Sequence, residues 1–178
     1  MFISRIIRAL LLDPNLYEEI ENDKNSILQA MIVVLLSSVA AGIYTYDYGG
    51  ARGLVIGTIV TFAGWVLMSF LIYIVGTKLF PETETKTDVG EILRVLGFAA
   101  APGIFILVAL LPLINQIVWL LILVIWVWRF VAMIIAVRQA LDFKNTWSAI
   151  WVCVVGLFAY LLVYIILLAY GLPKPIWS

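Results

Sequence analysis

The chain has 178 residues, of which 65 % are hydrophobic and 12 % are charged, and its mean hydropathy is +1.12. A water-soluble domain cannot bury so much apolar surface, so the composition indicates a protein whose solvent is lipid. Eleven Lys and Arg residues balance eleven Asp and Glu residues, and the chain has no His. The missing His excludes histidine-based metal sites and Ser-His or Cys-His nucleophile pairs.

The first residues predict an amphipathic helix. Apolar side chains recur at helical spacing along one face, at Phe2, Ile3, Ile6, Ile7, Leu10 and Leu11. Arg5 and Arg8 lie on the opposite face, which suits a helix lying flat in the inner membrane interface.

A second short helix is predicted next, because Asp13 is a favoured N-cap and Pro14 a favoured first helical residue. The acidic face of this helix contains Glu18, Glu19 and Glu21. That face is either simply solvated or a docking surface for a cytoplasmic partner.

Five stretches are long and apolar enough to cross a hydrocarbon core of about 30 Å as helices, each of which needs ~20 residues. They are residues 27–44, 53–76, 92–111, 117–137 and 147–170. The predicted fold is an all-α polytopic membrane protein with five transmembrane helices and an N-terminal amphipathic interfacial helix. In domain terms, a cytoplasmic arm of residues 1–25 precedes a five-span transmembrane domain of residues 26–178.

The ends of the spans carry further local signals. Ser26 with Gln29, and Asp88 with Glu91, predict capping boxes at the starts of the first and third spans. Residues 45–52 are expected to form an outer loop, and residues 112–116 a tight hairpin. Inside the spans, three tryptophans are expected to be packing residues: Trp65, Trp126 and Trp128.

Basic residues are distributed unevenly across the predicted membrane. Nine of them fall on one side, namely Arg5, Arg8, Lys24, Lys78, Lys86, Arg94, Arg129, Arg138 and Lys144. Only Arg52 and Lys174 fall on the other side. By the positive-inside rule the richer side is cytoplasmic, so we expect a multi-pass cell-membrane protein with its N-terminus in the cytoplasm and its C-terminus outside.

Small residues suggest where helices approach each other closely. Gly53 and Gly57 form a small-x-x-x-small pair on the second span, and Ser38 with Gly42 on the first span is a natural mate. Two interpretations remain open: packing within one chain, or dimerisation.

Three arginines are candidate contacts for lipids or a partner: Arg94, Arg129 and Arg138. Arg129 lies well inside the fourth span, where an unpaired charge is costly. It either extends to the inner interface or has a specific partner, such as a phospholipid phosphate or Glu91. Arg94 leans toward the cytoplasm, so it should reach headgroups easily.

The third span is expected to break near its middle. Pro102 has no N–H and therefore frees the carbonyl of Phe98, which should kink or end the helix. Gly97, Gly103 and the alanines between them would let a neighbour pack against the break. The break is either purely structural or a site for a ligand or lipid.

The stretch from Arg94 to Pro102, RVLGFAAAP, resembles the third-span signature of the prokaryotic branch of the Yip family, the Ypt/Rab-interacting, Yip-one-type domain. The similarity continues in the helix at residues 14–20, in the five spans and in the turn AVRQALDFKNTWSAI that leads into the last span. The resemblance implies a five-span membrane protein with a cytoplasmic N-terminus. In eukaryotic relatives it also implies vesicle trafficking and small-GTPase contacts, but their Asp-Leu-Tyr-Gly-Pro motif is missing from this chain.

Two functional hypotheses follow. The first is a non-enzymatic scaffold or membrane-organising factor that acts through contacts with membrane lipids, copies of itself or other membrane proteins. The second is a passive channel, transporter or lipid-handling protein with a site at Pro102 and Arg129. No span carries an acidic residue near its middle, which counts against an ion-coupled carrier. The sequence predicts no enzyme activity, no cofactor and no nucleic-acid partner.

Overall fold

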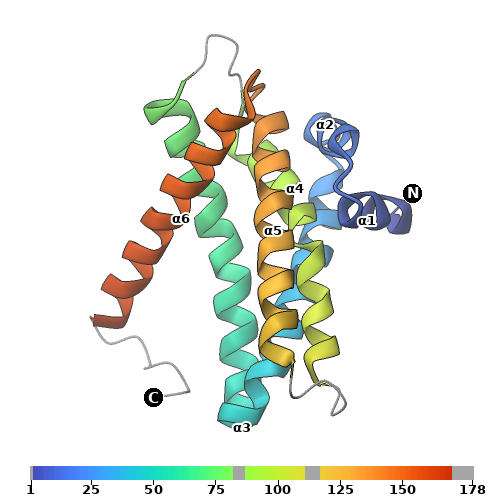
Figure 1. Cartoon of the computed structure of the whole chain (residues 1–178), viewed down its shortest axis with the longest axis vertical. Coiled ribbons are helices and arrows are strands. Elements are labelled where there is room, and N and C mark those ends of the chain that lie inside the picture. Colours follow the sequence, from blue (N-terminus) through green and yellow to red (C-terminus); the bar gives the residue numbers. More distant parts are fainter. Residues whose placement is uncertain (1, 82–86, 111–116, 170–178) are drawn as a thin grey trace.

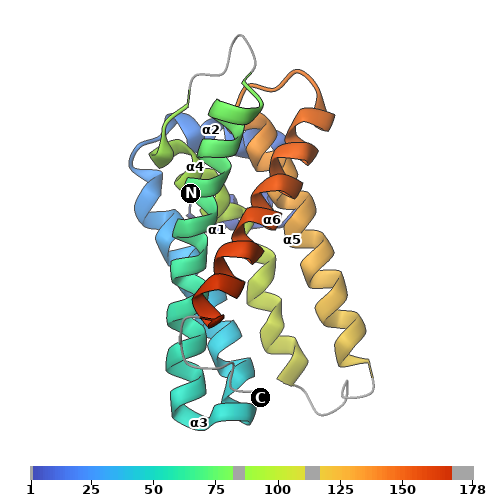
Figure 2. The same cartoon turned by 90° about the vertical axis from the view of Figure 1, so that its left-hand side faces the viewer.

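The computed structural model describes residues 2–81, 87–110 and 117–169, and within them every regular element is helical. In chain order the elements are α1 (Phe2–Leu10), α2 (Pro14–Asn22), α3 (Ser26–Ile74), the π-helix η1 (Val75–Leu79), α4 (Val89–Ala99), the 3₁₀ helix η2 (Ala101–Leu110), α5 (Val118–Ala140) and α6 (Thr146–Ala169). Together they form an upright bundle with α1 and α2 set against one side near one end (Figures 1 and 2). We call that end the α2 end.

The five predicted spans are confirmed. They cover Ser26–Tyr46, Gly49–Leu79, Val89–Ala109, Val118–Ala140 and Thr146–Leu167. The predicted hairpin at residues 112–116 lies outside the described residues. The all-α polytopic membrane fold therefore stands as predicted from hydropathy.

The outer loop predicted at residues 45–52 is wrong, because the backbone stays helical there on both sides of a single residue. Gly50 has φ +58° and ψ −148°, a conformation that glycine adopts without steric cost, and it reverses the chain between the two halves of α3. The Thr45 hydroxyl lies 2.8 Å from the Gly42 carbonyl and 2.9 Å from the Gly53 carbonyl, so it bridges the two halves beside the turn.

Helix starts agree with the local signals in two of three cases. Asp13 caps α2 by accepting from the Asn15 N–H, and Asp88 with Glu91 forms the predicted capping box of α4. The box predicted for Ser26 and Gln29 is wrong. The Ser26 hydroxyl instead donates to the Ile20 carbonyl near the end of α2, and the Gln29 amide oxygen accepts from Arg5 of α1.

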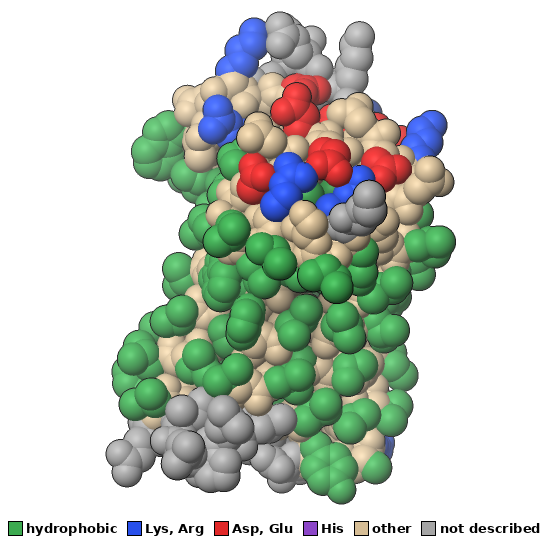
Figure 3. All heavy atoms as spheres, turned by 90° about the vertical axis from the view of Figure 1, so that its right-hand side faces the viewer, with side chains coloured by type: hydrophobic (Ala, Val, Ile, Leu, Met, Phe, Trp, Pro, Cys, Tyr) green, Lys and Arg blue, Asp and Glu red, His purple; other side chains and the backbone are tan. Residues whose placement is uncertain are grey.

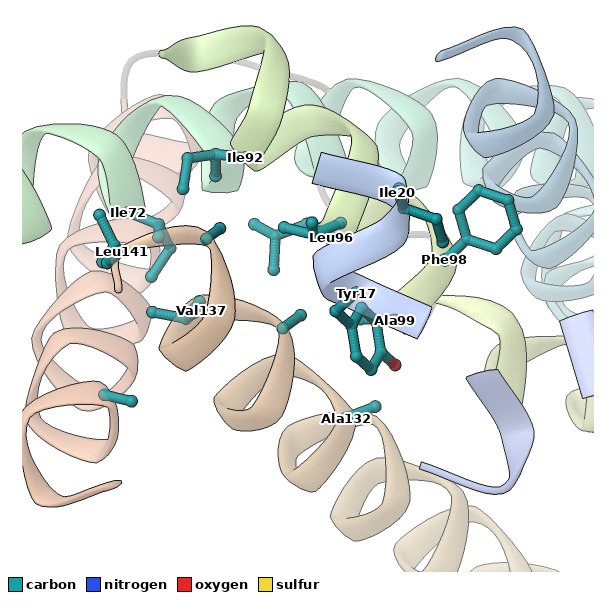
Figure 4. Packing of buried hydrophobic residues seen from close by; sticks show 14 of the residues in the cluster. Tyr17, Ile20, Ile72, Ile92, Leu96, Phe98, Ala99, Ala132, Val137 and Leu141 are labelled. Atoms are coloured by element: carbon teal, nitrogen blue, oxygen red, sulfur yellow. The ribbon is translucent and has the colours of Figure 1, made fainter. Parts of the chain in front are cut away.

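α2 is built into the hydrophobic core. Leu16, Tyr17 and Ile20 are fully buried, in one cluster with residues of α3, α4, α5 and α6. Figure 4 shows Tyr17 and Ile20 among Phe98, Ala99 and Ala132. The boundary between arm and transmembrane domain at residues 25 and 26 stays a prediction, but α2 shares its core with the spans.

α1 lies across the bundle instead of along it (Figure 1). Trp128, near the midpoint of α5, donates its indole N–H to the Leu10 carbonyl at 3.1 Å, which satisfies one of the free carbonyls at the end of α1. The outward side of α1 and the turn directly after it keep Ile3, Ile7 and Leu11 exposed, at 72 %, 51 % and 75 %.

The predicted packing role holds for two of the three tryptophans inside the spans. Trp65 donates to the Leu93 carbonyl at 3.2 Å and Trp128 to that of Leu10. It is wrong for Trp126, which is 60 % exposed on the outer face of α5.

Candidate functional site

Among the described residues, two polar clusters contain residues that were singled out from the sequence. The first is the α1–α2 charge network, which consists of Arg5, Arg8, Asp13, Glu19 and Asp23. The second is the break cluster inside the bundle, which consists of Ser37, Gly103, Arg129 and Tyr160. Figure 3 shows charged side chains near one end of the face it views, with a mostly hydrophobic surface below them.

The charge network ties α1 to α2. Arg5 pairs with Glu19 at 2.8 Å and with Asp23 at 2.9 Å, while Arg8 pairs with Asp13 at 2.7 Å and also with Glu19. The prediction of a simply solvated acidic face is therefore wrong for Glu19, which bridges both arginines.

The ion pairs shift the protonation of the groups in the network. Hydrogen bonds from Arg8 and then Arg5 lower the pKa of Glu19, and the hydrogen bond from Arg8 lowers that of Asp13. Both carboxylates thus stay ionised well below neutral pH. A cavity of about 380 Å³ opens between the two helices and is lined by Ser4, Arg5, Arg8, Glu19, Asp23 and Gln29.

Glu21 differs from the other acids of α2. Its pKa is raised to about 7, first by burial and then by the nearby carboxylates of Asp142, Glu91 and Glu18, against the opposing effect of Arg94. Sequence reasoning missed this shift, because Glu21 is partly buried by packing and two of the three carboxylates, Asp142 and Glu91, come from other parts of the chain.

Arg94 caps the C-terminal end of α2. Its guanidinium donates from Nε to the Ile20 carbonyl at 3.2 Å and from Nη2 to the Glu21 carbonyl at 2.5 Å, and the residue is only 6 % exposed. The last carbonyls of a helix lack partners within it and carry partial negative charge, so a buried guanidinium satisfies both needs. The guanidinium of Arg94 already donates to two protein carbonyls. The headgroup contact expected for Arg94 stays a prediction.

Arg138 closes the turn after α5. Its Nε donates to the Phe143 carbonyl at 3.4 Å, and the residue is otherwise exposed at the α2 end. Its predicted contact with lipid or a partner stays a prediction that this exposure allows.

The predicted helix break lies at Pro102, and a neighbouring span supports it. α4 ends at Ala99 and the chain continues as a 3₁₀ helix from Ala101. The Ser37 hydroxyl of α3 donates to the Ala100 carbonyl at 2.8 Å, and the Gly103 N–H donates to the same oxygen at 2.9 Å. The backbone at the break is therefore held by a side chain that sequence reasoning did not single out.

Two glycines near the break have no room for a side chain. A Cβ added to Gly97 would lie 2.6 Å from the Cβ of Ala30, so α4 and α3 pack backbone to backbone there. A Cβ added to Gly103 would lie 2.7 Å from Nη1 of Arg129 and 3.2 Å from the Cβ of Ser37.

The Arg129 guanidinium therefore lies against the helix break. Its guanidinium also lies 5.7 Å from the ring centre of Trp126 and close enough to Tyr160 of α6 to interact electrostatically. Glu91, a partner considered from the sequence, instead accepts from the Asp88 N–H in the capping box. Within the described part of the chain Arg129 makes no hydrogen bond or ion pair, although an unpaired charge inside a protein costs several kcal/mol.

The small-residue positions bring the two halves of α3 together. A Cβ on Gly57 would lie 3.2 Å from the Cα of Gly42, and one on Gly42 would collide with Thr58. Gly53 is buried beside them, while the Ser38 hydroxyl is buried with no partner among the described residues. These contacts occur within one chain, and contact with a second copy stays a prediction.

The described residues contain no group of His, Cys, Asp and Glu side chains that could hold a metal ion. Cys153 is a free thiol buried in α6.

Comparison with known proteins identifies a family. The family model of the Yip1 domain matches residues 8–168, which include α2 and all five spans. No curated protein and no solved structure matches the chain significantly. The match extends over far more than half of the chain, so the protein belongs to the Yip1 domain family.

Proposed function

We propose that this Yip1-domain protein is a non-enzymatic scaffold that organises the cytoplasmic leaflet through lipid and protein contacts at its α2 end. The observation that carries the proposal is α1, which is fixed to the bundle while one apolar row remains uncovered. The Trp128 indole and the pairs of Arg5 and Arg8 with Glu19 set its position.

The uncovered row has a natural place in a membrane. Ile3, Ile7 and Leu11 are exposed in the chain, and transfer of such side chains from water to an apolar environment contributes about 1.5–3 kcal/mol each. A helix that inserts this row into the boundary between headgroups and acyl chains would occupy area in one leaflet only. Because α1 is fixed to a transmembrane bundle, its insertion would act on the surrounding lipid instead of serving as an anchor.

The orientation in the membrane is part of the proposal. Most of the basic residues lie toward the α2 end. By the positive-inside rule, this distribution favours a cytoplasmic location for that end.

Packing at the helix break supports a scaffold over a passive conduit. Ala99, Ala100 and Ala101 are 4 %, 7 % and 0 % exposed, and the polar atoms beside them are satisfied by Ser37 and Gly103.

The proposal is tested by reconstituting the full chain into phosphatidylcholine liposomes that contain some phosphatidylglycerol. The wild type is compared with a variant carrying Ile3→Gln, Ile7→Gln and Leu11→Gln. We expect the wild type to change vesicle diameter in electron micrographs and the variant to lose most of that effect. A matched control carries Leu28→Gln, which replaces an exposed apolar residue of a span. Equal vesicle diameters for wild type and the α1 variant would refute the proposed role.

A further inference from the structure

Arg129 is an uncompensated cation in the middle of a span. It is eleven residues from each end of α5, which is about 16 Å along the helix axis in either direction. An arginine side chain is much shorter than this distance, so its guanidinium cannot reach either end of α5. Any group that neutralises this charge must therefore come close to the middle of α5.

Among the described residues, the surroundings of Arg129 offer an aromatic ring and hydroxyl groups but no carboxylate paired with it. Trp126 provides a cation–π contact at 5.7 Å, and no hydrogen bond from the guanidinium N–H groups is found within the described part of the chain. The Ser37 hydroxyl already donates its hydrogen bond to the Ala100 carbonyl. The Tyr160 hydroxyl, near both Arg129 and Gly64, makes no hydrogen bond among the described residues.

Gly103 lets the guanidinium lie directly against the broken backbone of the third span. Its missing side chain provides the space, since a Cβ would come within 2.7 Å of Nη1. The cluster thus joins α5, η2, α3 and α6 around one cation and one free hydroxyl.

From this arrangement we propose that the break cluster binds a phosphate-type oxyanion, with Arg129 as the main ligand and the Tyr160 hydroxyl as a second donor. A guanidinium presents parallel N–H groups that match two oxygens of such an anion, and the low dielectric strengthens the contact. The oxyanion comes either from an anionic phospholipid headgroup or from free inorganic phosphate. This proposed site goes beyond the scaffold role proposed for α1, and either proposal can hold without the other.

The test uses native mass spectrometry of the full chain released from nanodiscs that contain phosphatidylcholine and phosphatidylglycerol. Thermal unfolding in detergent with added inorganic phosphate forms a parallel arm. We expect the wild type to retain phosphatidylglycerol, and Arg129→Leu to bind it about tenfold more weakly or worse, which corresponds to the loss of a charge-assisted contact. Stabilisation by inorganic phosphate that requires Arg129 would identify the free anion as the ligand, whereas retention of phospholipid alone would identify the headgroup.

Three further variants separate binding from folding. Gly103→Ala keeps the charge but displaces the guanidinium, so it should weaken binding, and Tyr160→Phe should weaken it a few-fold. Arg52→Leu removes an exposed Arg away from the cluster and should bind as the wild type does. If Arg129→Leu cannot be purified, Tyr160→Phe compared with Arg52→Leu provides the test. Binding that is absent from the wild type, or equal in wild type and cluster variants, would overturn the proposed site.

Discussion

Replacing Arg94 by Leu tests how strongly the spans hold α2. The change removes two hydrogen bonds from a buried cation, at 3.2 Å to Ile20 and 2.5 Å to Glu21, and leaves both carbonyls without that donor. Hydrogen bonds to charged groups contribute about 1.5–3 kcal/mol each, so two of them amount to roughly 3–6 kcal/mol. The desolvation cost of the buried guanidinium, which disappears in the variant, offsets part of this. We expect a net loss of about 3 kcal/mol in the free energy of unfolding.

Two measurements check this expectation. Chemical unfolding of the full chain in detergent should give a lower midpoint for Arg94→Leu, and amide hydrogen exchange should rise within α2 before it rises in α5. Arg94→Lys keeps the charge but loses the planar guanidinium, so its unfolding midpoint should lie between those of the wild type and Arg94→Leu. Arg138→Leu is the matched control, because this arginine is exposed and its bond to Phe143 is long, at 3.4 Å. If exchange in α2 were unchanged in Arg94→Leu, the proposed capping of α2 by this side chain would be refuted.

Three further predictions concern single contacts. Ser37→Ala should lower the free energy of unfolding by about 0.5–1.5 kcal/mol, because the buried Ala100 carbonyl loses one of its two donors and keeps the Gly103 N–H, whereas Ser38→Ala should be neutral or stabilising; a larger loss for Ser38→Ala in thermal unfolding would contradict this. Gly97→Ala should cost about 1–3 kcal/mol through its clash with Ala30, measured in the same way, and an unchanged midpoint would show that the two spans can separate freely. Glu21 has a folded-state pKa of about 7 against an ordinary 4.5, so the folded state holds the extra proton and stability should fall as pH rises from about 5 to 7. Glu21→Gln should remove this decline in unfolding midpoints measured across that range, and a decline of equal size in the variant would assign it to other groups.

The spans were predictable because hydrophobic length alone specifies a membrane helix, and the capping signals of Asp13 and Asp88 act within a few residues. The break at Pro102 was likewise local, since a missing N–H is a property of one residue. The turn at Gly50 was misjudged as a loop because a single glycine can reverse a chain that otherwise has every feature of a helix.

The partners at the candidate site could not be predicted. The sequence identified Arg94 and Arg129 as unusual, but the carbonyls of Ile20 and Glu21 and the hydroxyl of Tyr160 come from distant parts of the chain. Which carbonyl a side chain contacts depends on how the helices pack, and local sequence patterns do not specify that packing.

The 3₁₀ helix η2 changes the length of the third span. A 3₁₀ helix rises about 2.0 Å per residue against about 1.5 Å in an α-helix, so the ten residues of η2 extend about 5 Å further than the same residues would as an α-helix. Val89–Ala109 has only 21 residues but matches the reach of an α-helix of about 24. A conversion of η2 to an α-helix would shorten this span and leave the other spans unchanged. The span would then be too short for the local bilayer, and the helices beside it would have to accommodate the difference in length.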